Sequence, residues 1–549
     1  MQPRRAAAVL VALALTLTVA ACSGDDDGAP DTTPTTAPPT EGANGVLTEV
    51  AARLSHQITI AGVVEVDAAQ PVQVQVTATA GDEVVEVPRT ARARRDHQIP
   101  VVGLHAETTY TLDVQAFDES GDEVDRATTE LATGALPDWI PPITLNGNDT
   151  ERMAPGVTLF DIQRWGVTNP PGEPPGMLVA LDEQGEVVWY LGNDLGAGDS
   201  RMDQDGNIWF LFAPFGFKEV DLLGRRIQSW AWGGPEDVRP GGPTIVDSEQ
   251  YDLVSFHHEV APQPDGDIVA FSRYELDLTD EEQEAICPGD PVDFGIREDV
   301  VMEFTRDGRI LHEWPLHEVL DPAEIPGREL CSVDYEDYRD WAHGNGIVLD
   351  EADNQVIVSA RHIDLLFAFR YEDDADGPSG ELLWSIGPNG TLPLDGEPSY
   401  GLHAPELEED GSILVFDNGN DRPGEVPYSR AVRYEVDDSA ADPADWSARQ
   451  TWEFRTDDLE TGDPLYADFL GDADQLPNGN VLVGFGGIGQ EVPPARGRII
   501  EVVPTGSEGG DIVWDVSLPD TYTSYRAERL ASLYAGPRWM TDVVVPIVS

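Results

Sequence analysis

Histidines recur at equivalent positions of a repeated sequence pattern. In FHHEVAPQPDGDIVAF, His258 stands eight residues before Gly266, and in GLHAPELEEDGSILVF, His403 stands eight residues before Gly411. Each glycine completes an Asp-Gly turn that leads into an apolar strand. Since a repeated fold gives equivalent positions equivalent surroundings, the spacing predicts that these histidines face one shared site.

A third copy of the pattern, WAHGNGIVLDEADNQVIVSAR, contributes His343 and Arg361. A guanidinium is a permanently charged, forked donor that suits oxyanions. An imidazole can act as a nucleophile, an acid or a base. No Asp-x-Asp motif, phosphate-binding glycine loop or nearby cysteine accompanies them. The combination predicts a site that handles an anionic group.

Metal binding is the second interpretation of these histidines. Imidazole is a common ligand of transition metals, but no carboxylate stands at a recognisable ligand spacing from them. We therefore expect the site to work with neither a metal ion nor a cofactor.

The elements that position these side chains form a repeat that fills residues 138–549. Six apolar strands follow turns that contain glycine or asparagine, at Gly176, Gly206, Gly266, Asn354, Gly411 and Gly479. Six partner strands end in tryptophan, at Trp189, Trp230, Trp314, Trp384, Trp452 and Trp514. The two series interleave, which predicts a six-bladed β-propeller with the tryptophans packed between blades. The first strand of each propeller blade lines the central channel, so histidines from different blades can face one another there.

Residues 44–137 show a different period. Short alternating strands such as PVQVQVTATA are separated by turn residues at the spacing of a β-sandwich. The segment LHAETTYTLDVQAFDESG resembles the penultimate strand of fibronectin type III domains, with Tyr110 as the corner tyrosine and Leu104 and Leu112 as core residues. The predicted fold class is all-β: a small fibronectin-III/Ig-like β-sandwich, acting as a spacer or interaction module, followed by the propeller.

The first residues have the features of a secretory signal. Arg4 and Arg5 precede an apolar run that ends in Val-Ala-Ala-Cys. This ending resembles a bacterial lipobox, which makes residues 1–21 a lipoprotein signal peptide and Cys22 the lipidated residue. Residues 22–43 are rich in Pro, Thr and Asp and are expected to form a disordered tether. We expect an extracytoplasmic protein that contacts the bacterial membrane only through its lipid.

Charge and the remaining cysteines agree with this location. Acidic residues outnumber basic ones by 102 to 33, which gives a net charge of −69. Such a surface repels nucleic acid and anionic membranes, so neither is an expected partner. Cys287 and Cys331 lie in two long insertions, and an oxidising compartment favours a disulfide between them. Two free thiols are the alternative.

The segments HHEVAPQPDGDIVAF, DWAHGNGIVLD to SAR, GLHAPELEEDGSILVFDNG and YSRAVRYEV occur in this order. Together with the ending SYRAERLASLY, they resemble the bacterial arylsulfate sulfotransferases over most of residues 138–549. The resemblance implies a six-bladed propeller that moves a sulfuryl group from an aryl sulfate to a phenol without a nucleotide sulfate donor. The implied route is ping-pong, through a sulfated histidine, and the resemblance leaves a homodimer open.

The resemblance also implies roles for particular residues. His403 would be the nucleophile, and His343 and Arg361 would hold the sulfuryl oxygens together with the amide of Asn345. The acid/base histidine falls in the His-His pair, where His257 and His258 both remain open. His258 is preferred because it shares the register of His403 relative to the turn.

Two further positions match the family's pattern. Asn418 in FDNG and Arg430 in YSR would bind substrate, or else serve turn chemistry and surface packing. Two other functions compete with sulfuryl transfer. One is a non-catalytic propeller lipoprotein that binds a small anion or a protein. The other is a quinoprotein-like dehydrogenase, because ALDEQGEVVW resembles the tryptophan motif of those propellers.

Overall fold

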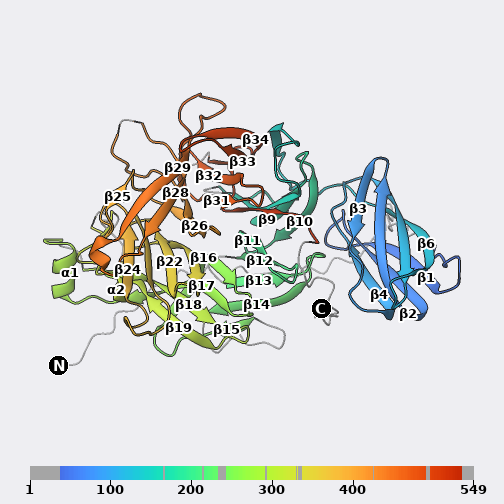
Figure 1. Ribbon diagram of the computed structural model, residues 1–549, viewed down its shortest axis with the longest axis horizontal. Coiled ribbons are helices and arrows are strands. Elements are labelled where there is room, and N and C mark those ends of the chain that lie inside the picture. Colours follow the sequence, from blue (N-terminus) through green and yellow to red (C-terminus); the bar gives the residue numbers. More distant parts are fainter. Residues whose placement is uncertain are drawn as a thin grey trace, which may run out of the picture. The chain divides into compact units, whose positions relative to one another are not determined.

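The computed structural model describes residues 38–534, apart from 165–166, 213–215, 233–242, 291–292, 329, 332–336, 425 and 490–494. The described part is nearly all β-structure (Figure 1). Its helices are short: α1 (Asp280–Ile286), α2 (Leu316–Val319) and the 3-10 turn η1 (Pro443–Asp445). None of the helices in these residues is long and apolar enough to cross a membrane. The predicted signal peptide and Cys22 lie outside the described residues.

Residues 47–132 form a sandwich whose two sheets share one long strand. Its strands are β1 (Leu47–Leu54), β2 (Gly62–Ala80), β3 (Glu83–Val87), β4 (Arg94–Val101), β5 (Thr109–Phe117) and β6 (Glu123–Ala132). The first half of β2 pairs with β1 and β4, and its second half pairs with β3 and β5, which carries β6. Tyr110, Leu104 and Leu112 are fully buried, as expected for core residues. The end of the predicted tether joins this sandwich, since Thr40 bridges to Val50.

Six further sheets follow one another along the chain (Figure 1). The first sheet contains β8 (Val157–Arg164), β9 (Gly176–Leu181), β10 (Val187–Asn193), β35 (Tyr522–Thr523) and β36 (Ala527–Leu530), and the second contains β11 (Gly198–Met202), β12 (Ile208–Leu211), β13 (Gly216–Val220), β14 (Arg226–Trp232) and β15 (Thr244–Val246). The third sheet contains β16 (Leu253–Pro262), β17 (Ile268–Leu276), β18 (Gly295–Phe304), β19 (Ile310–Pro315) and β20 (Tyr338–Asp340), and the fourth contains β21 (Gly344–Asp350), β22 (Gln355–Ala360), β23 (Leu365–Arg370) and β24 (Leu382–Ile386). The fifth sheet contains β25 (Leu394–Asp395), β26 (His403–Leu407), β27 (Ile413–Asp417), β28 (Arg430–Asp437) and β29 (Ser447–Phe454), and the sixth contains β30 (Ala467–Phe469), β31 (Asp472–Gln475), β32 (Val481–Ile488), β33 (Arg496–Pro504), β34 (Gly510–Ser517) and β7 (Thr144–Asn148).

The six sheets close into a ring, which confirms the predicted six-bladed propeller. The innermost strands contact one another in sequence, from β11 through β16, β21 and β26 to β31. Strand β36 contacts both β11 and the sixth sheet. The C-terminal strands β35 and β36 pair with β8 as the inner edge of the first sheet, while β7 pairs with β34 as the outer edge of the last. Both ends of the propeller sequence therefore take part in closing the ring.

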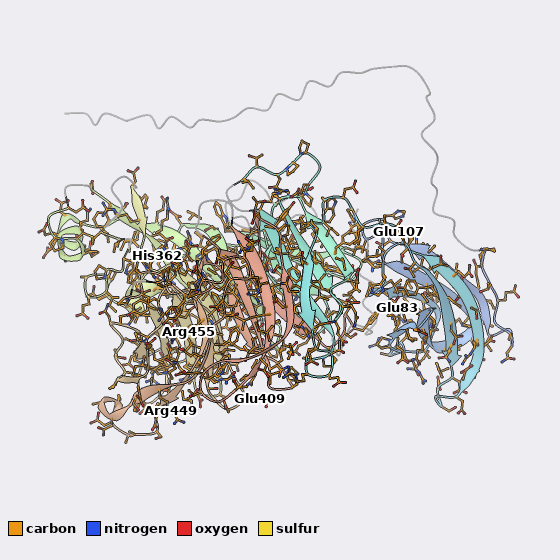
Figure 2. The ribbon with its side chains drawn as sticks, turned by 90° about the horizontal axis from the view of Figure 1, so that it is seen from above. Glu83, Glu107, His362, Glu409, Arg449 and Arg455 are labelled. Carbon is orange, nitrogen blue, oxygen red and sulfur yellow. A yellow bond between two sulfur atoms is a disulfide. The ribbon has the colours of Figure 1, made fainter. Side chains whose placement is uncertain are left out.

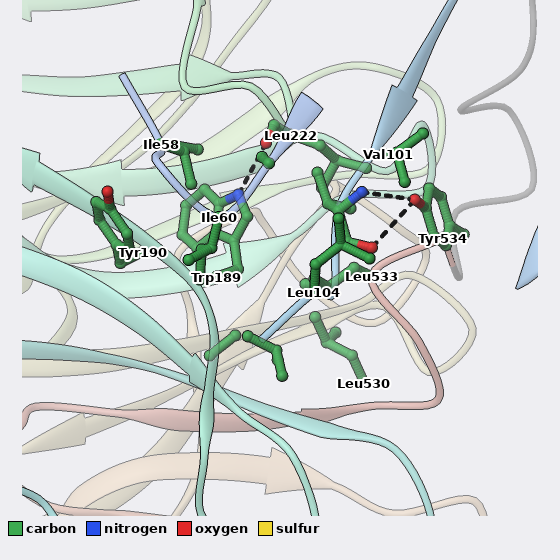
Figure 3. Packing of buried hydrophobic residues seen from close by; sticks show 14 of the residues in the cluster. Ile58, Ile60, Val101, Leu104, Trp189, Tyr190, Leu222, Leu530, Leu533 and Tyr534 are labelled. Atoms are coloured by element: carbon green, nitrogen blue, oxygen red, sulfur yellow. Dashed lines mark hydrogen bonds between the residues drawn. The ribbon is translucent and has the colours of Figure 1, made fainter. Parts of the chain in front are cut away.

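The strand-end tryptophans pack between blades, as the sequence indicated. All six are buried, and several indole N–H groups donate to the following sheet. The Nε1–H of Trp189 donates to the Leu222 carbonyl at 2.8 Å, and that of Trp230 donates to the Arg306 carbonyl at 2.9 Å (Figure 3 shows the first). Trp189 belongs to the segment that resembles the quinoprotein motif, and its role here is packing.

One apolar cluster contains residues of the sandwich and of the first blade (Figure 3). Ile58 and Leu104 of the sandwich belong to the same cluster as Trp189 and Leu533. Beside them, the hydroxyl of Tyr534 accepts the backbone N–H of Val102 at 2.8 Å. Leu533 and Tyr534, the last described residues, thus pack in the apolar cluster that contains residues of the sandwich and of the first blade.

A disulfide joins Cys287 to Cys331, with 5.5 Å between their Cα atoms. This confirms the predicted pairing and ties the insertion after β17 to the insertion after β19. The bond closes a loop with a sequence separation of 44 residues. In the chain-entropy model, a loop of this length is worth about 4 kcal/mol, an upper figure because native strain and residual structure in the unfolded chain reduce it.

We expect the double variant C287S/C331S to unfold at a lower temperature than the wild-type protein, because its unfolded chain is less constrained. Calorimetry with and without reductant measures this. Reductant should lower the melting temperature of the wild type and leave the double variant unchanged. Equal melting temperatures for the wild type and the double variant, both without reductant, would show that the bond contributes nothing to stability.

Side chains near the inner strands bind backbone groups of the next blade around the whole ring. Carboxylates accept N–H groups of the next blade in five places: Glu528 from Met202 at 2.8 Å, Asp199 from Val260 at 2.7 Å, Asp299 from Gly344 at 2.7 Å, Glu406 from Gln475 at 2.6 Å and Asp472 from Ala527 at 3.2 Å. Between the fourth and fifth blades, the amide of Asn345 donates to the Leu402 carbonyl at 2.9 Å. We call these six contacts the inter-blade clasps.

Burial, which is partial for Glu406 and Glu528, raises the pKa values of three clasp carboxyls. The pKa of Glu406 is raised to about 8, that of Glu528 to about 7 and that of Asp472 to about 6. Above the ordinary carboxyl pKa, the folded protein therefore binds more protons than the unfolded chain, and its stability falls as pH rises through these values. Buried histidines with lowered pKa values oppose this trend only below their usual pKa of 6.5.

We therefore expect the melting temperature to fall as the pH rises from 6.5 toward 8, the interval between the usual histidine pKa and the pKa of Glu406. Glu406→Gln keeps an acceptor for the Gln475 N–H but does not titrate, so its melting temperature should fall less, by an amount equivalent to about 1 kcal/mol. Exposed Glu409→Gln is the matched control. Parallel pH curves for wild type and Glu406→Gln would contradict this assignment.

Candidate active site

The inner strands of successive blades share a local distortion that aims side chains at the channel. Non-glycine residues with positive φ occur at Asp199, His258, His343, Ala404 and Leu470, with values between 46° and 58°. In the blades that carry the histidines, the strand register shifts beside these residues. Such β-bulges bend a strand and redirect one side chain, and they are common next to functional sites. The repeated bulge explains why the histidines of three blades converge.

The structure brings the predicted histidines together around a tyrosine. The ring centroids of His258 and His343 lie 4.7 Å apart. The Tyr525 ring lies 5.9 Å from His258 and 6.2 Å from His403. Tyr525 comes from the C-terminal segment before β36, and its hydroxyl donates to the Asn345 carbonyl at 2.9 Å. Tyr525 is buried, and its ring lies beside both His258 and His403.

His403 is buried, and its neighbours fix its tautomer. The Asn418 side-chain N–H₂ donates to the carbonyls of Ala467 and Leu470, both at 2.8 Å. The amide oxygen of Asn418 therefore faces Nδ1 of His403, 2.6 Å away, and the Gly401 carbonyl lies 3.1 Å from the same atom. Two acceptors place the proton on Nδ1 and leave the lone pair on Nε2. Burial, together with the charge of Arg361, lowers the pKa of His403 well below its usual value, so the ring is neutral at neutral pH.

His258, rather than His257, faces the other site residues. His258 contacts His343 and Tyr525, whereas His257 stacks on Phe271 with 5.4 Å between ring centroids. Burial, together with the neighbouring His343, lowers the pKa of His258 well below its usual value. A neutral imidazole in this position can accept a proton from a ligand.

The third histidine pairs with a carboxylate that the sequence analysis missed. Nδ1 of His343 donates to Asp340, 2.6 Å away. Although burial raises the pKa of Asp340, His343 and His362 outweigh it, so the net pKa lies below the usual range. Asp340 precedes His343 by three residues, so the spacing in DWAH was a usable signal. The expectation that no carboxylate stands at a ligand spacing from these histidines was wrong, because donor atoms of Asp340, His343 and His362 lie close together.

Arg361 reaches the cluster beside a second missed residue, His362, which Figure 2 labels within the propeller. Nη1 of Arg361 donates to Nε2 of His362 at 3.2 Å, and Nη2 donates to the Asp468 carbonyl at 3.0 Å. Nδ1 of His362 in turn donates to the Asp340 carbonyl at 3.1 Å. Burial, together with His343, lowers the pKa of His362 to about 3, so it remains a neutral acceptor for the guanidinium.

The side chains of Asp340, His343 and His362 have donor atoms within 4.8 Å of one another, the spacing of a metal site. The hydrogen bonds just described account for this grouping. Both nitrogens of His362 already have partners, and one partner is the Arg361 guanidinium, which would repel a cation. The donor set therefore fits an anion-binding arrangement better than a metal ion.

The side chains of Asn345 and Asn418 make hydrogen bonds to protein groups around His403. Asn345 is fully buried, and its amide donates to the Leu402 carbonyl at 2.9 Å and accepts from the Ser359 hydroxyl at 2.5 Å. It thereby braces the segment just before His403. Asn418 contacts His403 directly, as described above.

Arg430 lies in a different environment from the other predicted residues. It is fully buried, and its Nε donates to Asp417 at 2.8 Å. Its Nη1 binds Glu453 and Nη2 donates to the Glu397 carbonyl at 3.0 Å. Since protein groups occupy all three nitrogens, this guanidinium serves the packing of the fifth blade.

Two arylsulfate sulfotransferases are similar to this chain: that of Escherichia coli O6:H1 is 24% identical and that of Lelliottia amnigena 25% identical, each match covering 37% of this chain and 42% of the relative. The match thus spans less than half the length of either relative. A periplasmic gluconolactonase of Pseudomonas aeruginosa is similar with 14% identity and a TM-score of 0.32, over 83% of this chain and all of that one.

The model of the family described as "Arylsulfotransferase (ASST)" matches residues 167–526. These residues include every histidine of the cluster, Arg361, and Tyr525 near the start of the closing segment. Because the match covers more than half of the 549 residues, the chain belongs to the arylsulfotransferase family.

Proposed function

We propose that the protein transfers a sulfuryl group from an aryl sulfate to a phenol, with the group held in between on Nε2 of His403. The observation that carries this proposal is the tautomer of His403. Asn418 and the Gly401 carbonyl hold the proton on Nδ1, so the Nε2 lone pair is free to attack. The family membership and the similar arylsulfate sulfotransferases support the same reaction.

In the first half-reaction, Nε2 of His403 attacks sulfur and the bond from sulfur to the aryl oxygen breaks. The aryl oxygen leaves with the electron pair as an aryloxide, and any proton that it then needs comes from solvent. Arg361 and His343 stabilise charge on the three peripheral oxygens, which, by analogy with phosphoryl transfer, is the main demand of this reaction. The Nδ1–H of His403 keeps its hydrogen bond to the amide oxygen of Asn418 while positive charge develops on the ring.

In the second half-reaction, a phenol replaces the departed aryl group. Nε2 of His258 takes the phenol proton, the phenol oxygen attacks sulfur, and the bond from sulfur to Nε2 of His403 breaks. His403 then regains its lone pair, and the proton on Nδ1 has not moved. Neutral His258 and neutral His403 are both required, in keeping with the lowered pKa values of the two rings.

The test is to mix the purified protein with p-nitrophenyl sulfate, with and without phenol, and to follow nitrophenol release and intact mass. We expect a sulfate adduct on the enzyme that disappears when phenol is added, with faster release in the presence of phenol. Absence of both the adduct and turnover with any aryl sulfate would overturn the proposal.

We also propose that the protein is anchored outside the bacterial membrane through lipid on Cys22, with its small aryl substrates as partners and no cofactor. The Val-Ala-Ala-Cys sequence supports this location. Cys22→Ser should move the protein from the membrane fraction to the soluble fraction. Continued retention of that variant on membranes would contradict lipid anchoring.

A further inference from the structure

A buried chain of groups stands behind His258. Nδ1 of His258 lies 2.8 Å from Nδ1 of His257. On the far side of that ring, Nε2 of His257 lies 3.1 Å from the Asp299 carboxylate and 3.3 Å from the Ser272 carbonyl. Asp299 lies on β18 and is 1% exposed, and His257 is 6% exposed. No step proposed so far uses either residue.

The contacts of His257 determine where the protons of both rings lie. Asp299 and the Ser272 carbonyl are both acceptors, so the proton of His257 is on Nε2. Nδ1 of His257 then has a lone pair and accepts the Nδ1–H of His258. His258 is left with its own lone pair on Nε2, the atom that must accept a proton from the phenol.

Asp299 also positions a second histidine of the site. Its other oxygen accepts the backbone N–H of Gly344, the residue after His343, at 2.7 Å. Arg273 lies 3.6 Å from the carboxylate and balances its charge. Burial raises the pKa of Asp299, but His257 outweighs it, so the net pKa is lowered and the group is ionised. One carboxylate thus connects His258 and the backbone of His343.

We propose that Asp299 and His257 are positioning residues that hold His258 as the general base toward the phenol acceptor. This inference rests on the proposed function. When Nε2 of His258 takes the phenol proton, the new imidazolium donates its Nδ1–H to His257, whose Nε2–H faces the negative charge of Asp299. The pair therefore fixes the reactive nitrogen and stabilises the charge that forms on it.

The experiment isolates the half-reaction that needs a base. The full-length protein is loaded with p-nitrophenyl sulfate, freed of donor and then mixed with a phenol in mildly alkaline buffer, and loss of the adduct is followed by intact mass. One acceptor, 4-methylphenol, is un-ionised in this buffer, and the other, 4-cyanophenol, is largely an anion that has no proton to give. We expect Asp299→Asn and His257→Phe to slow transfer to 4-methylphenol by about tenfold or more and to leave transfer to 4-cyanophenol nearly unchanged.

His257→Phe keeps an aromatic ring against Phe271 while removing the acceptor for His258. Glu298→Gln is the matched control, because Glu298 is a buried carboxylate on the same strand that binds the backbone N–H of His317 instead. Equal slowing with both acceptors, or no slowing with either, overturns the inference. If the wild-type protein forms no adduct, the proposed function fails as well, and the two failures are thereby distinguished.

Discussion

Replacing His403 by alanine is expected to abolish the sulfate adduct and to lower turnover of aryl sulfates by at least about 10³-fold, the scale seen when a covalent nucleophile is removed. Alanine also leaves Asn418 and the Gly401 carbonyl without the N–H they accept. Intact mass and nitrophenol release measure the two effects. The matched control is His312→Gln, since His312 lies on the outer strand β19 against Trp314. An adduct that persists in His403→Ala would place the sulfate on another residue.

Asn418 gives a sharper form of the same test. A neutral amide leaves His403 neutral, whereas a carboxylate in its place would favour the imidazolium, which has no lone pair on Nε2. Asn418→Asp should therefore move the acid limb of the pH–rate profile of adduct formation to higher pH, with activity partly regained in alkaline buffer. An unchanged profile would mean that the partner of Nδ1 does not set the protonation of the nucleophile.

The second large effect is expected at Arg361. Its guanidinium is held by His362 and the Asp468 carbonyl, which leaves its charge beside His403. Arg361→Met should lower the rates of adduct formation and adduct loss alike, each by about 10²–10³-fold, as for loss of one oxyanion donor. Both steps are affected because the sulfuryl oxygens are present in both. Arg361→Lys keeps the positive charge without the forked donor geometry of the guanidinium, so its rates should fall between those of the wild type and Arg361→Met.

Single-turnover measurements by intact mass separate the two steps for these variants. Arg449→Met is the control, because Arg449, which Figure 2 labels, is exposed on β29 and pairs with Glu435. Slowing of only one half-reaction in Arg361→Met would assign the residue to the leaving or entering aryl group instead of the sulfuryl oxygens.

The sequence predicted the propeller because its repeat is local. A turn that contains glycine or asparagine, an apolar strand and a tryptophan at the end of an outer strand recur within each blade, so Gly266 and Trp314 could be interpreted without knowing the rest of the molecule. The shared spacing of His258 and His403 from their turns has the same local origin. Their convergence followed from the fold alone.

What the sequence could not show depends on contacts between distant residues. Tyr525 lies far along the chain from His258 and His403, which its ring contacts. No local sequence pattern assigns β36 to the first sheet. Asp299 reaches His257 and Gly344 only because the fold brings its side chain, on β18, within reach of β16 and of the next blade. Arg430 matched a family position, but its buried partners Asp417 and Glu453 come from neighbouring strands.

The closing strand has a consequence for when the site can assemble during synthesis of the chain. The inner edge of the first blade, and Tyr525 with it, comes from the last described residues of the chain. A nascent chain that has emerged as far as β34 already contains His258, His343 and His403. It still lacks the Tyr525 side chain, which lies beside two of them, and β36, which closes the ring of sheets. We therefore expect a chain that stops before β35 to form neither the closed ring of sheets nor the full histidine cluster with Tyr525.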